Sequence, residues 1–294
     1  MRNTPSEPPC NHPSRIRWSL LTLALASLAP LGHPAAQTLF VDEVPFVTSA
    51  DNVTVEMLRI SRVSSQDHLI DLGSGDGRIV IQAARRFGAT GLGVEIVPDL
   101  VEKSLQSARD AGVADKVDFK VQDLFKTDLS RATVVTMYLL PEVNLLLRPR
   151  LLQLRPGTRI VSHDWDMGEW KPDETTTVAV PNKTVGREKS SKIHLWTVPA
   201  QIGGLWCGTG PLSEFRLDLK QVFQEVEGTL TRRSRVREVH GRMQGDTLMT
   251  QQTRHGDLEA RLQDGVLRVS GGDGMLAVLK GSVFRKAPDG KCAG

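Results

Sequence analysis

The stretch Asp67-His68-Leu69-Ile70-Asp71-Leu72-Gly73-Ser74-Gly75-Asp76-Gly77-Arg78-Ile79-Val80-Ile81 decides the fold. Its apolar residues Leu69, Ile70 and Leu72 predict a short strand that is buried on both faces, as in a parallel sheet. The three glycines that follow permit a sharp turn and a close approach of the backbone to a ligand. Apolar residues return at helical spacing from Ile79, so the turn opens onto a helix N-terminus with free N–H groups. The stretch therefore predicts a cofactor-binding turn in an α/β domain.

The spacing of the glycines bears on which cofactor the turn binds. A dinucleotide fingerprint reads G-x-G-x-x-G, and its third glycine allows the helix to pack closely. Here the pattern is G-x-G-x-G, and Arg78 stands in the place of that third glycine. Asp71 and Asp76 flank the turn, which suits a cationic ligand better than a pyrophosphate. A nicotinamide oxidoreductase is therefore disfavoured.

Strands and helices alternate from the glycine turn to about residue 200, which predicts a Rossmann-like doubly wound sheet with right-handed crossovers. We expect further strands at about 91–96, 117–121, 134–138, 158–162, 175–180 and 192–198. We expect further helices at about 52–61, 98–112 and 143–154, the last interrupted or restarted at Pro149. Ser49 or Asp51 is expected to cap the helix at 52–61.

Three sites in the right order resemble the class I S-adenosylmethionine methyltransferases. Residues 71–77 match their first motif, D/E-x-G-x-G-x-G; Glu95 ends the next strand and Asp123 follows the third. The resemblance implies a seven-strand sheet whose last strand is antiparallel, and S-adenosylmethionine as the cofactor. It implies cofactor binding by Asp71, Gly73, Ser74, Gly75, Gly77, Glu95, Asp123, Leu124 and Tyr138.

The resemblance also implies a role for each group. The turn from Gly73 to Gly77 wraps the methionine part, and Asp71 orients it through the amino group or a water. Glu95 accepts hydrogen bonds from the two ribose hydroxyls, because the paired oxygens of a carboxylate suit a cis-diol. Asp123 receives the adenine amino group.

The end of the fourth strand bears on the methyl acceptor. DNA and glutamine amino-methyltransferases carry N/D-P-P-Y/F there, whereas this chain has Tyr138-Leu139-Leu140-Pro141, which disfavours methylation of a base or an amide. Residues 44–175 are similar to the lysine methyltransferases of the ATP synthase c-subunit type. That resemblance implies a protein lysine as one acceptor, although no single residue identifies the acceptor. It also suggests a cofactor contact from Phe46 or Thr48.

His163, Asp164 and Tyr138 are the candidate catalytic residues. His163 follows the fifth strand and is a candidate base for the acceptor's proton, tuned by Asp164 or Asp166. The alternative is that His163 and Trp165 only pack the loop. Asp76 balances the charge of the sulfonium or only caps the following helix.

The pattern changes at about residue 201. Phe215, Leu217 and Leu219 alternate with polar residues, and glycines punctuate the chain at short intervals, which predicts a small all-β sandwich or partly closed barrel with a binding or structural role. The expected boundaries are 1–36 for a signal peptide or membrane anchor, 37–200 for the methyltransferase domain and 201–294 for the all-β domain.

The N-terminal segment predicts export. Arg15 and Arg17 precede an apolar run at 18–31 and a small-residue zone at 34–36, as in a secretory signal. The protein is therefore expected either in the periplasm or anchored in the inner membrane, with membrane contact through this segment if it is uncleaved. Cleavage removes Cys10 and leaves Cys207 and Cys292 as a pair suited to one disulfide or, alternatively, as two unpaired thiols.

The composition narrows the range of possible functions. The net charge is +3 and aromatic residues are 5% of the chain, so neither a basic surface nor a base-stacking platform is indicated and no nucleic-acid partner is expected. No His/Cys cluster has metal-ligand spacing, so we predict no metal site. Because export separates an enzyme from cytosolic S-adenosylmethionine, a non-catalytic exported binding protein that retains the fold is the main alternative to a methyltransferase.

Overall fold

The computed structural model describes residues 47–252, 255–287 and 289–292. The expected export segment at 1–36, Cys10 and the expected cofactor contact from Phe46 lie outside the described residues. The described residues form two folded parts, a mixed sheet with its helices and a barrel.

Seven strands form one sheet in the order β3-β2-β1-β4-β5-β7-β6. The strands β3, β2, β1, β4 and β5 run parallel, whereas β7 is antiparallel to both β5 and β6. Their bounds are β1 His68–Leu72, β2 Thr90–Glu95, β3 Val117–Val121, β4 Val134–Met137, β5 Arg159–His163, β6 Glu174–Ala179 and β7 Ser190–Thr197. The prediction of a doubly wound seven-strand sheet with an antiparallel end is confirmed.

Four α-helices accompany the sheet in the described part of the chain, none of them long and apolar enough to cross a membrane. They are α1 Asp51–Ile60, α2 Arg78–Phe87, α3 Pro98–Asp110 and α4 Pro141–Leu151. The expected side-chain cap of α1 was wrong: Ala50 is the N-cap residue, and the Ser49 hydroxyl bonds His163 instead. Helix α4 runs through Pro149 without restarting, since the proline lies in its last turn.

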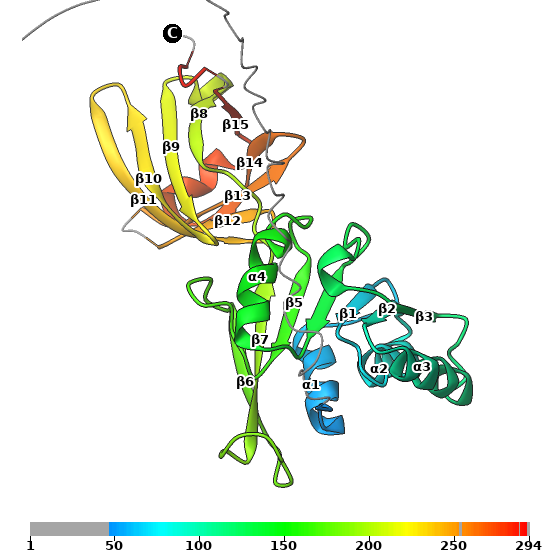
Figure 1. Ribbon diagram of the computed structural model, residues 1–294. Coiled ribbons are helices and arrows are strands. Elements are labelled where there is room, and N and C mark those ends of the chain that lie inside the picture. The colour runs from blue at the N-terminus through cyan, green and yellow to red at the C-terminus, as the bar shows by residue number, and fades with distance from the viewer. Residues whose placement is uncertain (1–46, 253–254, 288, 293–294) are drawn as a thin grey trace, which may run out of the picture. The chain divides into compact units, whose positions relative to one another are not determined.

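Alternate residues of the central strands face opposite layers. Leu69 packs in a core with side chains of α1, α2 and α3, whereas Ile70 and Leu72 pack in a second core that includes Leu147 and Leu151 of α4. The labels of Figure 1 locate these helices along the sheet. Because both faces are covered, the strands read as nearly continuous apolar runs, and their tips are left to carry polar groups.

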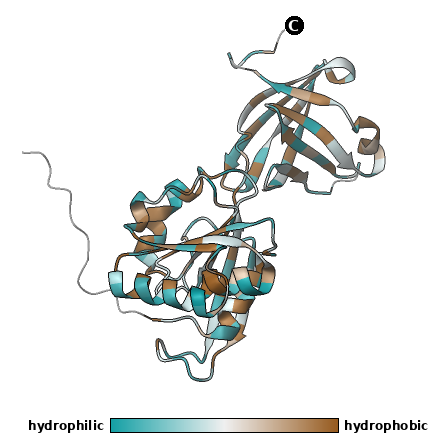
Figure 2. Cartoon of the chain, turned by 90° about the vertical axis from the view of Figure 1, so that its right-hand side faces the viewer, coloured by the Kyte–Doolittle hydropathy of each residue, from teal (hydrophilic) through white to brown (hydrophobic). Residues whose placement is uncertain are grey.

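The C-terminal strands close into an antiparallel eight-strand barrel. They are β8 Gly204–Gly208, β9 Phe215–Val222, β10 Glu225–Arg232, β11 Arg235–Gln244, β12 Thr247–Thr250, β13 Leu258–Gln263, β14 Val266–Gly272 and β15 Val283–Lys286. The prediction of a small all-β domain is confirmed, but the barrel is fully closed rather than a sandwich or partly closed barrel, because β15 pairs with β8 through Phe284 and Gly208 and leaves no open edge. Alternating hydropathy along the strands is visible in Figure 2. Leu217 and Leu219 of β9 face the barrel core.

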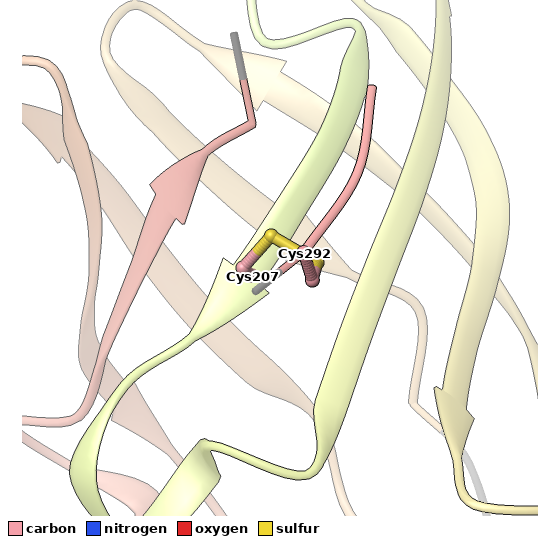
Figure 3. Close-up of a disulfide and its surroundings, with 2 residues drawn as sticks. All are labelled: Cys207 and Cys292. Atoms are coloured by element: carbon pink, nitrogen blue, oxygen red, sulfur yellow. A yellow bond between two sulfur atoms is a disulfide. The ribbon is translucent and has the colours of Figure 1, made fainter. Parts of the chain in front are cut away.

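A disulfide joins Cys207 of β8 to Cys292, which confirms the expected pair (Figure 3). The two Cα atoms are 5.5 Å apart, and the residues are separated by 85 positions in the sequence. The bond therefore encloses the chain from the first barrel strand to beyond the last one.

Replacing both Cys207 and Cys292 by serine should destabilise the barrel. In the chain-entropy model, a loop of this length contributes about 4 to 5 kcal/mol by restricting the unfolded state. We expect urea unfolding of the oxidised protein to move to lower denaturant on substitution, and a thiol reductant to cause a similar drop in the unsubstituted protein. A reductant that lowered the stability of the double variant equally would contradict the assignment.

Candidate functional site

The glycine turn between β1 and α2 adopts a backbone that other residues rarely reach. Gly73, Gly75 and Gly77 have φ values of 74°, 55° and 77°, in the left-handed region. A Cβ atom on Gly77 would also lie 2.7 Å from the ring of Phe119. The three glycines are therefore required by conformation, and at Gly77 by packing as well.

The tip of β2 holds this turn in place. Backbone N–H groups of Gly73 and Ser74 both donate to the Val94 carbonyl at 2.9 Å, and the Gly75 N–H donates to Glu95 Oε2 at 3.0 Å. The other carboxylate oxygen of Glu95 accepts the N–H groups of Ile96 and Val97 at 2.8 and 3.1 Å. Glu95 is thus oriented at the strand tip beside the turn, and its role as the ribose-binding acid stays a prediction.

Asp71 lies under the turn and is 2% exposed. The register of β1 and β4 places it opposite Thr136, whose hydroxyl donates to Asp71 Oδ1 at 2.7 Å. Burial raises the pKa of Asp71 to about 7; the Thr136 hydrogen bond opposes this shift, and the charges of Glu95 and Asp76 add to it. A cation bound nearby would favour the ionised form.

Asp76 is paired within the chain. Its carboxylate accepts Arg78 Nε at 2.9 Å and Arg78 Nη2 at 2.7 Å, while Arg78 Nη1 donates to the Ser49 carbonyl. Partial burial opposes ionisation of Asp76, but the hydrogen bonds and charge of Arg78 outweigh it and keep its pKa below the usual value. The guanidinium of Arg78 therefore balances the charge of Asp76.

The tip of β3 supplies the third acid of the predicted site. Asp123 Oδ1 accepts the Phe125 N–H at 2.8 Å and so caps the short 3₁₀ helix Leu124–Lys126, with Leu124 packed against the core of the sheet. Several large apolar side chains are exposed beside Glu95 and Asp123: Ile96, Val97, Val121 and Phe125. Exposed apolar side chains that flank two acids fit a flat heterocycle with a polar edge.

The polar groups of this site also fit a cationic nucleoside. Ser74 Oγ is buried in the turn without a hydrogen-bond partner, and buried polar atoms normally have one. Glu95 and Asp123 stand at neighbouring strand tips, and Asp71 lies one strand further along the sheet. The predicted cofactor residues from Asp71 to Leu124 are therefore brought together at one edge.

Tyr138 and His163 stack at the tips of β4 and β5, with ring centroids 3.8 Å apart. Tyr138 follows β4, and its neighbour Leu139 reaches the glycine turn: a Cβ on Gly73 would be 2.9 Å from Leu139 Cδ2. Burial, aided by the charge of Asp164, raises the pKa of Tyr138 to about 12. The phenol therefore remains protonated at neutral pH.

The contacts of His163 are those of a structural residue rather than of a base. Its Nδ1 is 2.8 Å from Ser49 Oγ and its Nε2 is 2.8 Å from Ser191 Oγ, and the residue is 2% exposed. Burial lowers the pKa of His163 to about 4, so the ring is neutral near pH 7. Serine hydroxyls occupy both ring nitrogens, which favours the alternative that His163 packs the loop over a role in taking the acceptor's proton.

Asp164 is the remaining candidate, and it is bound to a lysine. Its φ is 64°, and its Oδ1 accepts the Lys192 N–H at 3.0 Å. Its Oδ2 lies 2.7 Å from Lys183 Nζ and 3.5 Å from the Tyr138 hydroxyl. Asp166 is engaged elsewhere, since its Oδ1 accepts the Gly168 N–H.

The residues that the sequence did not reveal are the partners of these groups: Thr136, Leu139, Ser49, Ser191 and Lys183. Of these, Thr136 had a usable signal, because aligning β1 with β4 in parallel places it beside Asp71. Leu139 directly follows Tyr138, whereas Ser49, Ser191 and Lys183 come from other segments of the chain and carry no local pattern.

The chain is similar to known methyltransferases. The ANTKMT methyltransferase domain matches residues 71–174. A protein-lysine N-methyltransferase of Saccharolobus islandicus (strain REY15A) is 41% identical over 141 residues, which are 47% of this chain and 88% of that protein. The human lysine N-methyltransferase of the ATP synthase c-subunit is 34% identical over 157 residues, 53% of this chain and 65% of the human protein.

Among solved structures, an RNA methyltransferase from Salinibacter ruber in complex with S-adenosyl-L-homocysteine is 51% identical. The match covers 53% of this chain and 96% of that one, with a TM-score of 0.48. The family model and the lysine methyltransferase relatives, rather than this structure, identify the chain as a methyltransferase with S-adenosylmethionine as its cofactor.

We expect cofactor affinity to rise with pH through the titration of Asp71. The acid is half-protonated at about pH 7, and only its ionised form attracts the cofactor's ammonium group. The dissociation constant for S-adenosylhomocysteine should therefore fall roughly five- to tenfold from about pH 6 to about pH 8. Isothermal titration calorimetry across this range measures it.

Asp71→Asn should weaken binding and flatten this pH dependence, because the amide carries no charge. Asp118→Asn on β3, where the side chain is 60% exposed, is the matched control and should behave as the unsubstituted protein. An unchanged slope in Asp71→Asn would refute the role of Asp71.

Proposed function

Because the chain belongs to the S-adenosylmethionine-dependent methyltransferases of the ANTKMT methyltransferase domain family, we propose that it methylates a lysine side chain of a protein. The observation that carries this proposal is the 41% identity to a protein-lysine N-methyltransferase, 88% of which the chain covers. Lysine methyltransferases also recur among the other relatives, including that of the ATP synthase c-subunit.

The tips of β1, β2 and β3 would hold the cofactor. Asp71 and the turn at 73–77 face its amino-acid part, Glu95 its ribose and Asp123 its adenine, with Ile96 and Phe125 beside the ring. The bound cofactor supplies an electrophilic methyl group on sulfur. What the protein must then provide is alignment of an acceptor with that methyl group, since a direct displacement gains chiefly from positioning.

The tips of β4 and β5 support lysine as the acceptor. Asp164 already holds an ammonium group there, that of Lys183, at 2.7 Å. Tyr138 beside it keeps its proton and so can orient an amine by hydrogen bonding. An acceptor ammonium must lose a proton before it reacts, and because two serines occupy His163, Asp164 is the group that would accept that proton.

Comparing cells with and without the gene tests the acceptor. Mass spectrometry of envelope proteins should reveal a lysine whose methyl groups disappear on deletion and return with the unsubstituted gene. The gene carrying Glu95→Gln, which weakens ribose binding, should restore them poorly. Loss of a methylated RNA nucleotide, with all methyllysines unchanged, would contradict the proposal and favour an RNA acceptor.

We further propose that the protein is exported and works in the periplasm or at the outer face of the inner membrane. The signal-like pattern at 1–36 supports this, and so does the bond between Cys207 and Cys292, because disulfides persist in oxidising compartments. Contact with the membrane would then run through the N-terminal segment if it remains uncleaved. Export requires that S-adenosylmethionine reach the enzyme outside the cytosol.

Thiol trapping in fractionated cells tests export. Cys207 and Cys292 should resist alkylation unless a reductant is added first, and the protein should be released with the periplasm or sediment with the inner membrane. A cytosolic protein with both thiols freely alkylated would contradict the proposal. Deleting residues 1–36 should yield that cytosolic form and serves as the control.

A further inference from the structure

Lys183 is partly buried within an exposed stretch of the loop between β6 and β7. In that loop, residues 181–189 are all exposed apart from Lys183, whose side chain is 13% exposed. Its Nζ lies 2.7 Å from Asp164 Oδ2 and donates to the Ser190 carbonyl at 2.7 Å. Burying a flexible, charged side chain is costly unless it is paired, so Asp164 is what retains it.

Asp164 lies at the tips of β4 and β5, where the methyl acceptor is proposed to bind. It directly follows β5, which pairs with β4, and β4 in turn pairs with the turn-bearing strand β1. Its Oδ2 is 3.5 Å from the Tyr138 hydroxyl. The residue after Tyr138, Leu139, contacts the turn at Gly73. In the sheet, β4 alone therefore lies between β5, which Asp164 follows, and the turn-bearing strand β1.

We propose that Lys183 is itself a methyl acceptor of this enzyme, its ammonium group occupying the place where the ammonium of a protein substrate binds. This inference rests on the proposed function. The Lys183 ammonium gives a proton to Asp164, which passes it to solvent. The amine then forms an N–C bond as the C–S bond of S-adenosylmethionine breaks, leaving methylated Lys183 and S-adenosylhomocysteine.

Neighbouring lysines provide a contrast within the same hairpin. Lys189 is exposed, and its Nζ donates to the backbone carbonyl of Lys183 at 2.8 Å. Lys192 is exposed as well and reaches Asp164 through its backbone N–H and carbonyl. Among these three lysines, only Lys183 presents its amine to the carboxylate, so methylation should be confined to it.

The test uses the full-length protein and S-adenosylmethionine bearing a deuterated methyl group. Peptide mapping by mass spectrometry before and after incubation should place the label on Lys183 and not on Lys189 or Lys192. Lys183→Arg should abolish the label and Lys189→Arg should retain it, while Asp164→Asn should reduce it several-fold. Before the cofactor is added, an amine-reactive ester should modify Lys189 much faster than Lys183.

Calorimetry with S-adenosylhomocysteine separates the two possible failures. If the protein binds S-adenosylhomocysteine but Lys183 stays unlabelled, or if label spreads evenly over exposed lysines, Lys183 is only a structural partner of Asp164 and this inference is overturned. If S-adenosylhomocysteine does not bind, the proposed function falls and the inference falls with it. Binding with label on Lys183 alone supports both.

Discussion

The arrangement of the strand tips depends on one buried carboxylate. Asp71 is held by Thr136 beneath the glycine turn, in surroundings that oppose its charge, with Glu95 and Asp76 adding repulsion. A protein built only for stability would place an apolar residue here. Keeping an acid at this point makes sense when a cation arrives to compensate it, and Arg78 prevents Asp76 from competing for that cation.

The two halves of the sheet edge, β1 to β3 and β4 with β5, carry different kinds of side chain. Acids and apolar side chains at β1, β2 and β3 suit a nucleoside, whereas β4 and β5 carry Tyr138, His163 and Asp164. The serine-bound imidazole fixes Tyr138 by stacking, and Tyr138 in turn lies beside the carboxylate that holds an ammonium. Positioning, rather than acid–base strength, is what this half offers, which agrees with a displacement reaction whose leaving group needs no proton.

Features encoded by a local sequence pattern could be predicted, whereas features made by contacts between residues far apart in the chain could not. The turn at 73–77 and Asp123 each follow a strand and Glu95 ends one, so parallel strands bring them to one edge of the sheet. Closure of the barrel depended on β15 finding β8, which no local pattern encodes. His163 looked like a base because its partners, Ser49 and Ser191, lie 114 and 28 residues away. Lys183 could not be recognised as a site residue for the same reason, since the sequence shows only a charged residue in a polar loop.

The bond between Cys207 and Cys292 has a consequence for the integrity of the barrel. Since it joins the first barrel strand to a point beyond the last, every loop from β9 to β15 lies inside one covalent ring. A protease that nicks any of these loops leaves both fragments attached to each other, with all the strand pairings still available. Until a reductant opens the ring, a cut chain can keep its shape.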